Sequence, residues 1–76
     1  MTRFYNWYIS GRENSIILSI KGKLLDNGRV LADSPKEASE KAWAYFHETD
    51  GNRWLKRNDV KIEVCTDRDV IYQSED

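Results

Sequence analysis

The chain has 76 residues, which is enough for one domain and lies near the lower limit for a self-sufficient hydrophobic core. Its net charge of −1 argues against a general polyanion binder, because such domains are usually strongly basic. A single cysteine, Cys65, excludes an internal disulfide and a cysteine-rich zinc site, and it suits a reducing compartment.

The N-terminal half of the chain predicts three strands. Residues Phe4–Ser10 are aromatic and β-prone. After a polar turn at Gly11–Asn14, alternating aliphatic residues predict a second strand over Ser15–Leu25, and the two strands form a hairpin. Asp26-Asn27-Gly28 carries the Asn-Gly signal for a tight turn, so Arg29–Ala32 is expected to return as a short third strand.

Alternation along the first strand divides its large side chains between two faces. Tyr5, Trp7 and Ile9 share one side, and Phe4 and Tyr8 share the other, which we expect to lie away from the helix. Aromatic residues on a bare sheet face resemble the stacking platform of RNA-binding domains. They equally suit the apolar centre of a protein interface, and a third interpretation reverses the faces and places them in the core.

A helix is predicted over residues 35–48. Ser34 can accept a hydrogen bond from the backbone of Glu37, and the Glu37 side chain can reach back to Ser34. Pro35 occupies the first helical position, where its missing N–H costs nothing. Gly51 is placed to end the helix in a left-handed conformation.

The helix is expected to bury one stripe and to expose Trp43. Trp43 and His47 lie four residues apart on the opposite side, and a large aromatic ringed by polar groups is typical of a binding hot spot. Alternatively, Trp43 lies flat over lysine stems or a neighbouring loop. His47 has no second ligand or paired nucleophile nearby, so we predict no catalytic or metal site and no cofactor. The stripe expected to face the core consists of Ala38, Ala42, Tyr45 and Phe46.

The C-terminal part predicts a loop followed by two strands. Residues 53–59 form an irregular polar loop, residues 60–64 a half-buried strand, residues 66–69 a turn, and residues 70–72 a brief last strand. The predicted order is β-β-β-α-β-β. We therefore expect an α+β fold, a single domain over residues 1–76, with an antiparallel sheet of about four to five short strands and one helix packed on one face.

The loop before the penultimate strand holds the strongest nucleic-acid feature. Arg53, Trp54, Lys56 and Arg57 combine cations with an aromatic ring, which suits contact with phosphates and stacking on an unpaired base. The alternative is a solvated loop whose Trp54 and Leu55 tuck beneath the helix end as core residues.

Acidic residues accumulate after this loop. A row of carboxylates can imitate the phosphates of a nucleic acid and occupy a basic groove of a partner. The alternative is a solubilising surface that protects a sheet edge. The residues concerned are Asp59, Glu63, Asp67 and Asp69, continued by Glu75 and Asp76.

Three segments together resemble the layout of small phage-encoded inhibitors, among them some anti-CRISPR proteins. These segments are the aliphatic run Ile16-Ile17-Leu18-Ser19-Ile20, the helix start Ser34-Pro35-Lys36-Glu37-Ala38 with Ala42, and the strand Val60-Lys61-Ile62-Glu63-Val64. The resemblance covers roughly residues 15–65 and concerns architecture and size. It implies a stoichiometric inhibitor that blocks the nucleic-acid-binding or recruitment surface of a host protein.

We therefore expect a non-enzymatic protein-binding module, acting as a phage or mobile-element inhibitor of a bacterial defence or nucleic-acid-handling complex. Its expected interface residues are Trp43, His47, Phe4, Tyr8, Arg53, Trp54, Lys56 and Arg57. The alternative is a small RNA- or single-stranded-DNA-binding domain that uses the basic loop, with Phe4 and Tyr8 as stacking groups. Homodimerisation stays open. Without a signal peptide or an apolar membrane span, the expected location is the cytoplasm, with no membrane partner.

Overall fold

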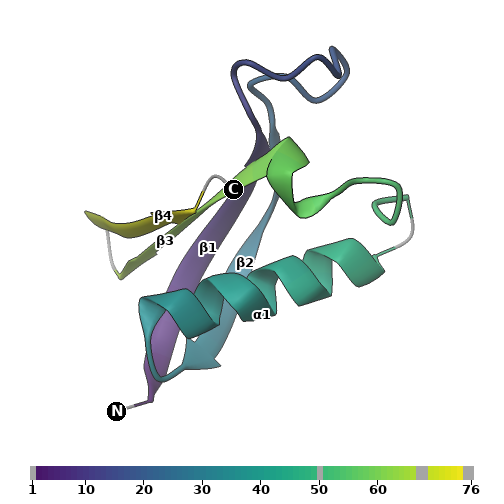
Figure 1. The fold of residues 1–76 in the computed structure, drawn as a ribbon. Coiled ribbons are helices and arrows are strands. Elements are labelled where there is room, and N and C mark those ends of the chain that lie inside the picture. Colours follow the sequence, from purple (N-terminus) through teal and green to yellow (C-terminus); the bar gives the residue numbers. More distant parts are fainter. Residues whose placement is uncertain (1, 50, 67–68, 75–76) are drawn as a thin grey trace.

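The computed structural model describes residues 2–49, 51–66 and 69–74, which form one antiparallel sheet crossed on one face by a helix (Figure 1). The four strands lie in the order β2-β1-β3-β4, and this arrangement confirms the predicted α+β class. A short 3-10 turn leads from the polar loop into the third strand. The elements are β1 (Arg3–Gly11), β2 (Leu24–Ala32), α1 (Pro35–Glu48), η1 (Arg57–Asp59), β3 (Val60–Thr66) and β4 (Asp69–Ser74).

Strand β1 lies in the middle of the sheet and divides its side chains as predicted. Tyr5, Trp7 and Ile9 are buried beneath α1, while Phe4 and Tyr8 are exposed on the other face. Because directly paired residues of neighbouring strands point to the same face, the register carries this division across the whole sheet.

The predicted second strand is wrong. Residues Arg12–Lys23 form a long loop that projects beyond the end of the sheet (Figure 1), and the chain returns to β1 only at Leu24. The predicted turn at Asn27-Gly28 is also wrong, since both residues lie within β2 and pair with Tyr8 and Trp7. The structure thus has two strands before the helix where the sequence predicts three.

Two glycines explain why β1 pairs with the later segment. A Cβ atom at Gly28 would lie 2.5 Å from Cζ2 of Trp7, so the indole occupies the space that any other residue at this position would fill. A Cβ atom at Gly11 would lie 1.9 Å from the carbonyl oxygen of Ile20. The absence of a side chain at Gly11 therefore lets the backbone of Ile20 pack against the end of β1. Ile20 is therefore buried in the core from a loop rather than from a strand.

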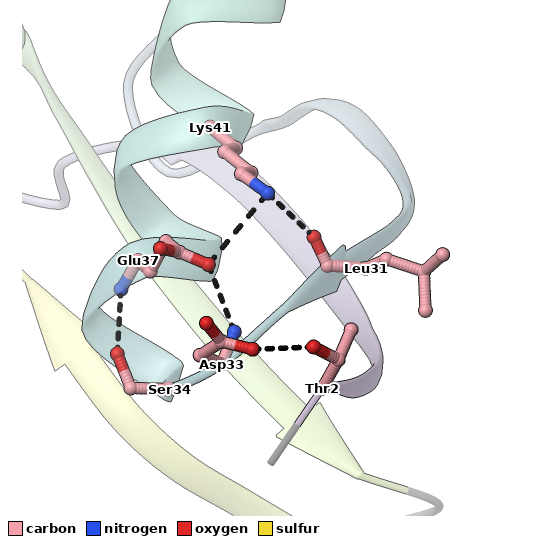
Figure 2. A network of polar contacts seen from close by, with 6 residues as sticks. All are labelled: Thr2, Leu31, Asp33, Ser34, Glu37 and Lys41. Carbon is pink, nitrogen blue, oxygen red and sulfur yellow. Dashed lines mark hydrogen bonds and ion pairs between the residues drawn. The ribbon is translucent and has the colours of Figure 1, made fainter.

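The helix begins where the sequence predicts, and its cap differs in one bond (Figure 2). Ser34 Oγ accepts a hydrogen bond from the Glu37 N–H at 3.1 Å, and Pro35 is the first helical residue. The Glu37 carboxylate accepts from the N–H of Asp33 at 2.8 Å instead of that of Ser34. The helix start is thereby tied to the residue that follows β2.

A second set of contacts connects the helix to the two neighbouring strands. Lys41 Nζ donates a hydrogen bond to the Leu31 carbonyl at 2.8 Å and lies 3.6 Å from the Glu37 carboxylate (Figure 2). The Thr2 hydroxyl, just before β1, donates to the carboxylate of Asp33. These bonds fix the angle at which α1 leaves β2.

The buried face of α1 is partly the predicted one. Ala38, Ala42 and Phe46 are buried, and the small alanines let the helix approach the sheet closely. Tyr45, predicted in this stripe, is 64% exposed at the side of the helix next to β2. The interpretation of Trp43 as an outward-pointing residue is also wrong, because this side chain is half-buried and packs against the core at the other side of the helix. Its contact with η1 agrees with the alternative, an indole that lies against a neighbouring loop.

The C-terminal strands follow the prediction closely. Val60, Ile62 and Val64 are fully buried on the face that meets α1, and Cys65 is buried as a free thiol. β4 pairs with β3 along the edge of the sheet. Gly51 has the predicted positive φ, 91°, but the helix already ends at Glu48 with Thr49 as an extended cap residue. Residues 67–68 of the predicted turn lie outside the described residues.

Candidate functional site: the open sheet face

Among the described elements, no helix covers the sheet face opposite α1 (Figure 1). This face carries exposed apolar side chains. On β1 these are Phe4, 51% exposed, and Tyr8, 37% exposed. Their neighbours on β2 are Leu31, paired with Phe4, and Leu24, paired with Ser10. We refer to Phe4, Tyr8, Leu24 and Leu31 as the open-face row.

Arg29 lies in the centre of this row. Its guanidinium carbon is 4.3 Å from the ring centroid of Phe4, a cation–π contact that holds both side chains in place. Arg29 pairs with Asn6, and Asn27 pairs with Tyr8, so polar groups alternate with the apolar ones. The mixture of aromatic, aliphatic and arginine side chains is typical of the central part of a protein interface.

The β3 side of the open face is polar. Lys61 pairs with Ser10, and Glu63 pairs with Tyr8. Gln73 on β4 donates a hydrogen bond from Nε2 to the Glu63 carboxylate at 2.7 Å. The open face therefore has an apolar half on β1 and β2 and a charged half on β3.

The predicted acidic surface does not form one row among the described residues. Asp59 lies in η1, where its carboxylate accepts a hydrogen bond from the Lys56 N–H at 2.7 Å and closes the turn. Glu63 lies on the open face and bonds to Gln73. Asp67 lies outside the described residues, and the side chain of Asp69 is not described either. The two visible acids thus have separate local partners.

The basic loop is divided between surface and core. Arg53, Trp54 and Lys56 are exposed, with Trp54 at 58%, while Leu55 is only 3% exposed. The alternative that both apolar residues fill the core is therefore right for Leu55 and wrong for Trp54. Arg57 is half-buried and donates a hydrogen bond from Nη1 to the Val60 carbonyl at 3.3 Å.

Three predicted interface residues meet at the side of the helix. The rings of Trp43 and His47 stack with their centroids 4.9 Å apart. The Arg57 guanidinium lies 5.9 Å from the Trp43 ring centroid. Phe46 lies on the inner side of Trp43, with a centroid distance of 5.9 Å. This cluster joins η1 to α1, so its side chains stabilise the packing of these two elements, and those of Trp43, His47 and Arg57 are also partly accessible to a binding partner.

The structure does not bring all predicted site residues onto one surface. The basic loop leads into Val60, which pairs with Gly11 at the last residue of β1. Phe4 lies at the opposite end of β1 and on the face away from α1. Phe4 and the loop residues therefore cannot stack the bases of one short strand together.

Several surface features were missed because a strand was predicted in place of the Arg12–Lys23 loop. Ile16 and Leu18 are 95% and 77% exposed on that loop, although their alternation with polar residues resembles a strand. Leu31 and Arg29 were missed because their cross-strand partners depend on the register. The flanking glycines Gly11 and Gly22 were the available signal, since Gly22 adopts a φ of 66°.

Two hollows lie beside the sheet. One, of about 320 Å³, lies between β2 and α1, and a smaller one, of about 190 Å³, lies between the Arg12–Lys23 loop and η1. In the described part of the chain, no three His, Cys, Asp or Glu side chains gather as metal ligands, and no helix is long and apolar enough to cross a membrane.

No family model, curated protein or solved structure matches the chain.

Proposed function

We propose that the chain is a non-enzymatic protein-binding module that binds its partner through the open sheet face. The observation that carries this proposal is the open-face row, four large apolar side chains left exposed on two adjacent strands. Scattered apolar residues are normal on a protein surface, whereas adjoining ones, such as the directly paired Phe4 and Leu31, mark interaction sites.

The geometry of the row favours binding because little ordering is needed. Phe4 and Tyr8 lie on the central strand of the sheet, and Arg29 already rests on the Phe4 ring. Side chains that are held in place before binding lose less conformational entropy when the partner arrives. Full burial of a large apolar side chain contributes about 1.5–3 kcal/mol, so completing the burial of this row supplies a substantial part of a specific affinity.

The nature of the partner rests on the resemblance to phage-encoded inhibitors. A bacterial defence or nucleic-acid-handling complex remains the predicted target. Inhibition would follow if the bound module covered the surface that such a complex uses for nucleic acid or for recruitment.

Affinity capture from bacterial lysate, followed by calorimetry with the captured protein, tests the proposal. The double variant Phe4→Ser/Leu31→Ser is expected to weaken binding at least tenfold, because truncation of central aromatic and aliphatic anchors costs on the order of 2 kcal/mol or more. Leu18→Ser is the matched control, since it removes an exposed aliphatic side chain away from the sheet. Capture of no protein, or equal affinity of the double variant and the control, would refute the open-face interface.

A second candidate function is binding of single-stranded nucleic acid, and the exposure of Trp54 between Arg53 and Lys56 favours it. An exposed ring flanked by cations can stack on a base while the cations contact phosphates. Fluorescence anisotropy with labelled oligonucleotides is expected to show affinity that falls steeply with salt and decreases in Trp54→Ala. Absence of binding at low salt would eliminate this function.

A further inference from the structure

Strand β2 is an edge strand, and α1 contacts its outer edge through Lys41. Lys41 Nζ donates to the Leu31 carbonyl at 2.8 Å (Figure 2), and from this contact we infer that the carbonyl points away from β1. In an antiparallel strand the N–H and C=O of one residue point to the same edge, and the direction alternates along the chain. Asn27 and Arg29 therefore direct their backbone groups outward like Leu31.

Both ends of this outer edge are occupied, but its centre is open. The Asn27 N–H donates to the Asp26 carboxylate at 2.8 Å, and the Leu31 carbonyl accepts a hydrogen bond from Lys41 Nζ. Between them, the N–H and C=O of Arg29 face outward, and none of the described strands lies beside them. An unpaired donor and acceptor on one edge residue can form two hydrogen bonds with an added strand.

The larger hollow lies directly beside this residue. Tyr45 and Trp7 meet edge to face with centroids 5.9 Å apart, and the missing side chain of Gly28 admits the indole. Among the described residues of the lining, Arg29 and Lys41 are charged, but the Arg29 guanidinium lies against Phe4 on the open face, so Lys41 is the cation on the α1 side. The hollow measures about 320 Å³ and is lined by Trp7, Asn27, Gly28, Arg29, Val30, Lys41 and Tyr45.

Side chains along a strand alternate between the two sheet faces, and this alternation determines which residue of an added strand would reach the hollow. A residue that pairs with Arg29 points to the open face, as Arg29 does, so the residues before and after it point to the α1 side. Val30, Lys41 and Tyr45 place the hollow on that side. One side chain of an added strand therefore enters the hollow when its neighbour pairs with Arg29.

We propose that an extended segment of a partner protein adds to the outer edge of β2 at Arg29 and inserts one aromatic or large aliphatic side chain into the hollow. The residue next to the inserted side chain pairs with Arg29 and meets its guanidinium on the open face, so charge complementarity favours an acidic residue there. A volume near 300 Å³ is the lower end for ligand pockets, so the hollow suits one side chain. This inference rests on the protein-binding part of the proposed function, uses the β2 edge and not the open-face row, and names the kind of segment that the partner presents.

Peptide selection with mapped binding tests the inference. Random dodecamers displayed on phage are selected on the immobilised chain, and the enriched sequence is titrated as a blocked synthetic peptide in amide-resolved NMR. We expect enriched sequences with an aromatic or leucine residue beside an acid. The signals of the Arg29 amide and the Trp7 indole N–H are expected to shift on binding.

Two substitutions at one position isolate the backbone bond. Arg29→Ala keeps the N–H and Arg29→Pro removes it, and proline is tolerated at an edge position whose N–H faces outward. Arg29→Pro is expected to weaken the peptide at least tenfold relative to Arg29→Ala. If Arg29→Pro fails to fold, Tyr45→Ala tests the hollow in place of the backbone bond by removing one of its walls, and at least a tenfold loss relative to wild type is expected.

The outcomes separate this inference from the proposed function. No enriched peptide, or equal binding to Arg29→Ala and Arg29→Pro (Tyr45→Ala and wild type where Arg29→Pro does not fold), would overturn the edge site. If a captured protein no longer binds the Phe4→Ser/Leu31→Ser variant, the open-face interface would still be supported. Conversely, a peptide that binds at the edge while no protein is captured would leave the edge site standing and the open-face interface refuted.

Discussion

The Trp7 indole lies over Gly28, and this contact decides the pairing of two strands. Asn-Gly is a strong turn signal by itself, because both residues readily adopt a positive φ. In this chain the same glycine has no side chain at the one cross-strand position where a buried indole needs room. The local preference for a turn is thus outweighed by burial of the largest side chain of β1.

We predict that Gly28→Ala destabilises the protein. Alanine in a strand would normally gain about 0.5–1 kcal/mol over glycine. The added Cβ atom would lie 2.5 Å from the Trp7 ring, however, and such overpacking costs about 1–3 kcal/mol. Urea unfolding followed by circular dichroism measures the change. The loss should be smaller in a Trp7→Phe background, and a gain in stability would contradict the contact.

Helix α1 is the element whose start is specified most locally. Ser34, Pro35 and Glu37 lie within four residues of each other, and the bonds from Glu37 N–H to Ser34 Oγ and from Asp33 N–H to the Glu37 carboxylate satisfy the first turn. Such bonds form between neighbours in the chain, so the sequence predicts them without knowledge of the sheet. Only the exact donor to Glu37 depends on how the chain leaves β2.

We expect Ser34→Ala to lower the free energy of unfolding by about 0.5–2 kcal/mol, because one helix N–H loses its acceptor. Ser19→Ala is the matched control, since Ser19 is exposed in the loop before β2. The midpoints of urea unfolding for the two variants provide the measurement. Equal midpoints would show that the cap contributes nothing.

At the scale of the whole molecule, a thin core is shared by one helix and one sheet face. A chain of 76 residues is expected to have a stability of roughly 4–11 kcal/mol, so single core residues matter. Phe46 belongs to the largest fully buried side chains and lies beneath Trp43. Its exposed neighbour Tyr45 lies outside this core.

We predict that Phe46→Ala costs about 3–5 kcal/mol, which is a large share of the total stability. Tyr45→Ala removes a side chain of similar size from the adjacent position and should cost less than about 1.5 kcal/mol, the contribution of its edge contact with Trp7. Thermal unfolding of both variants compares the two positions. A greater loss in Tyr45→Ala would contradict the observed rotation of the helix.

The sequence by itself determined the α+β class, the bounds of α1, and the division of β1 into a buried and an exposed face. These properties depend on caps and periodicity, which act between residues close together in the chain. Only the tertiary structure decided that Leu24–Ala32 pairs with β1, that Trp43 packs inward and Tyr45 outward, and that Leu31 and Arg29 join Phe4 on the open face. Register and helix rotation depend on how distant side chains fill a shared space, and here the fit of Trp7 over Gly28 decides between alternatives of similar local preference.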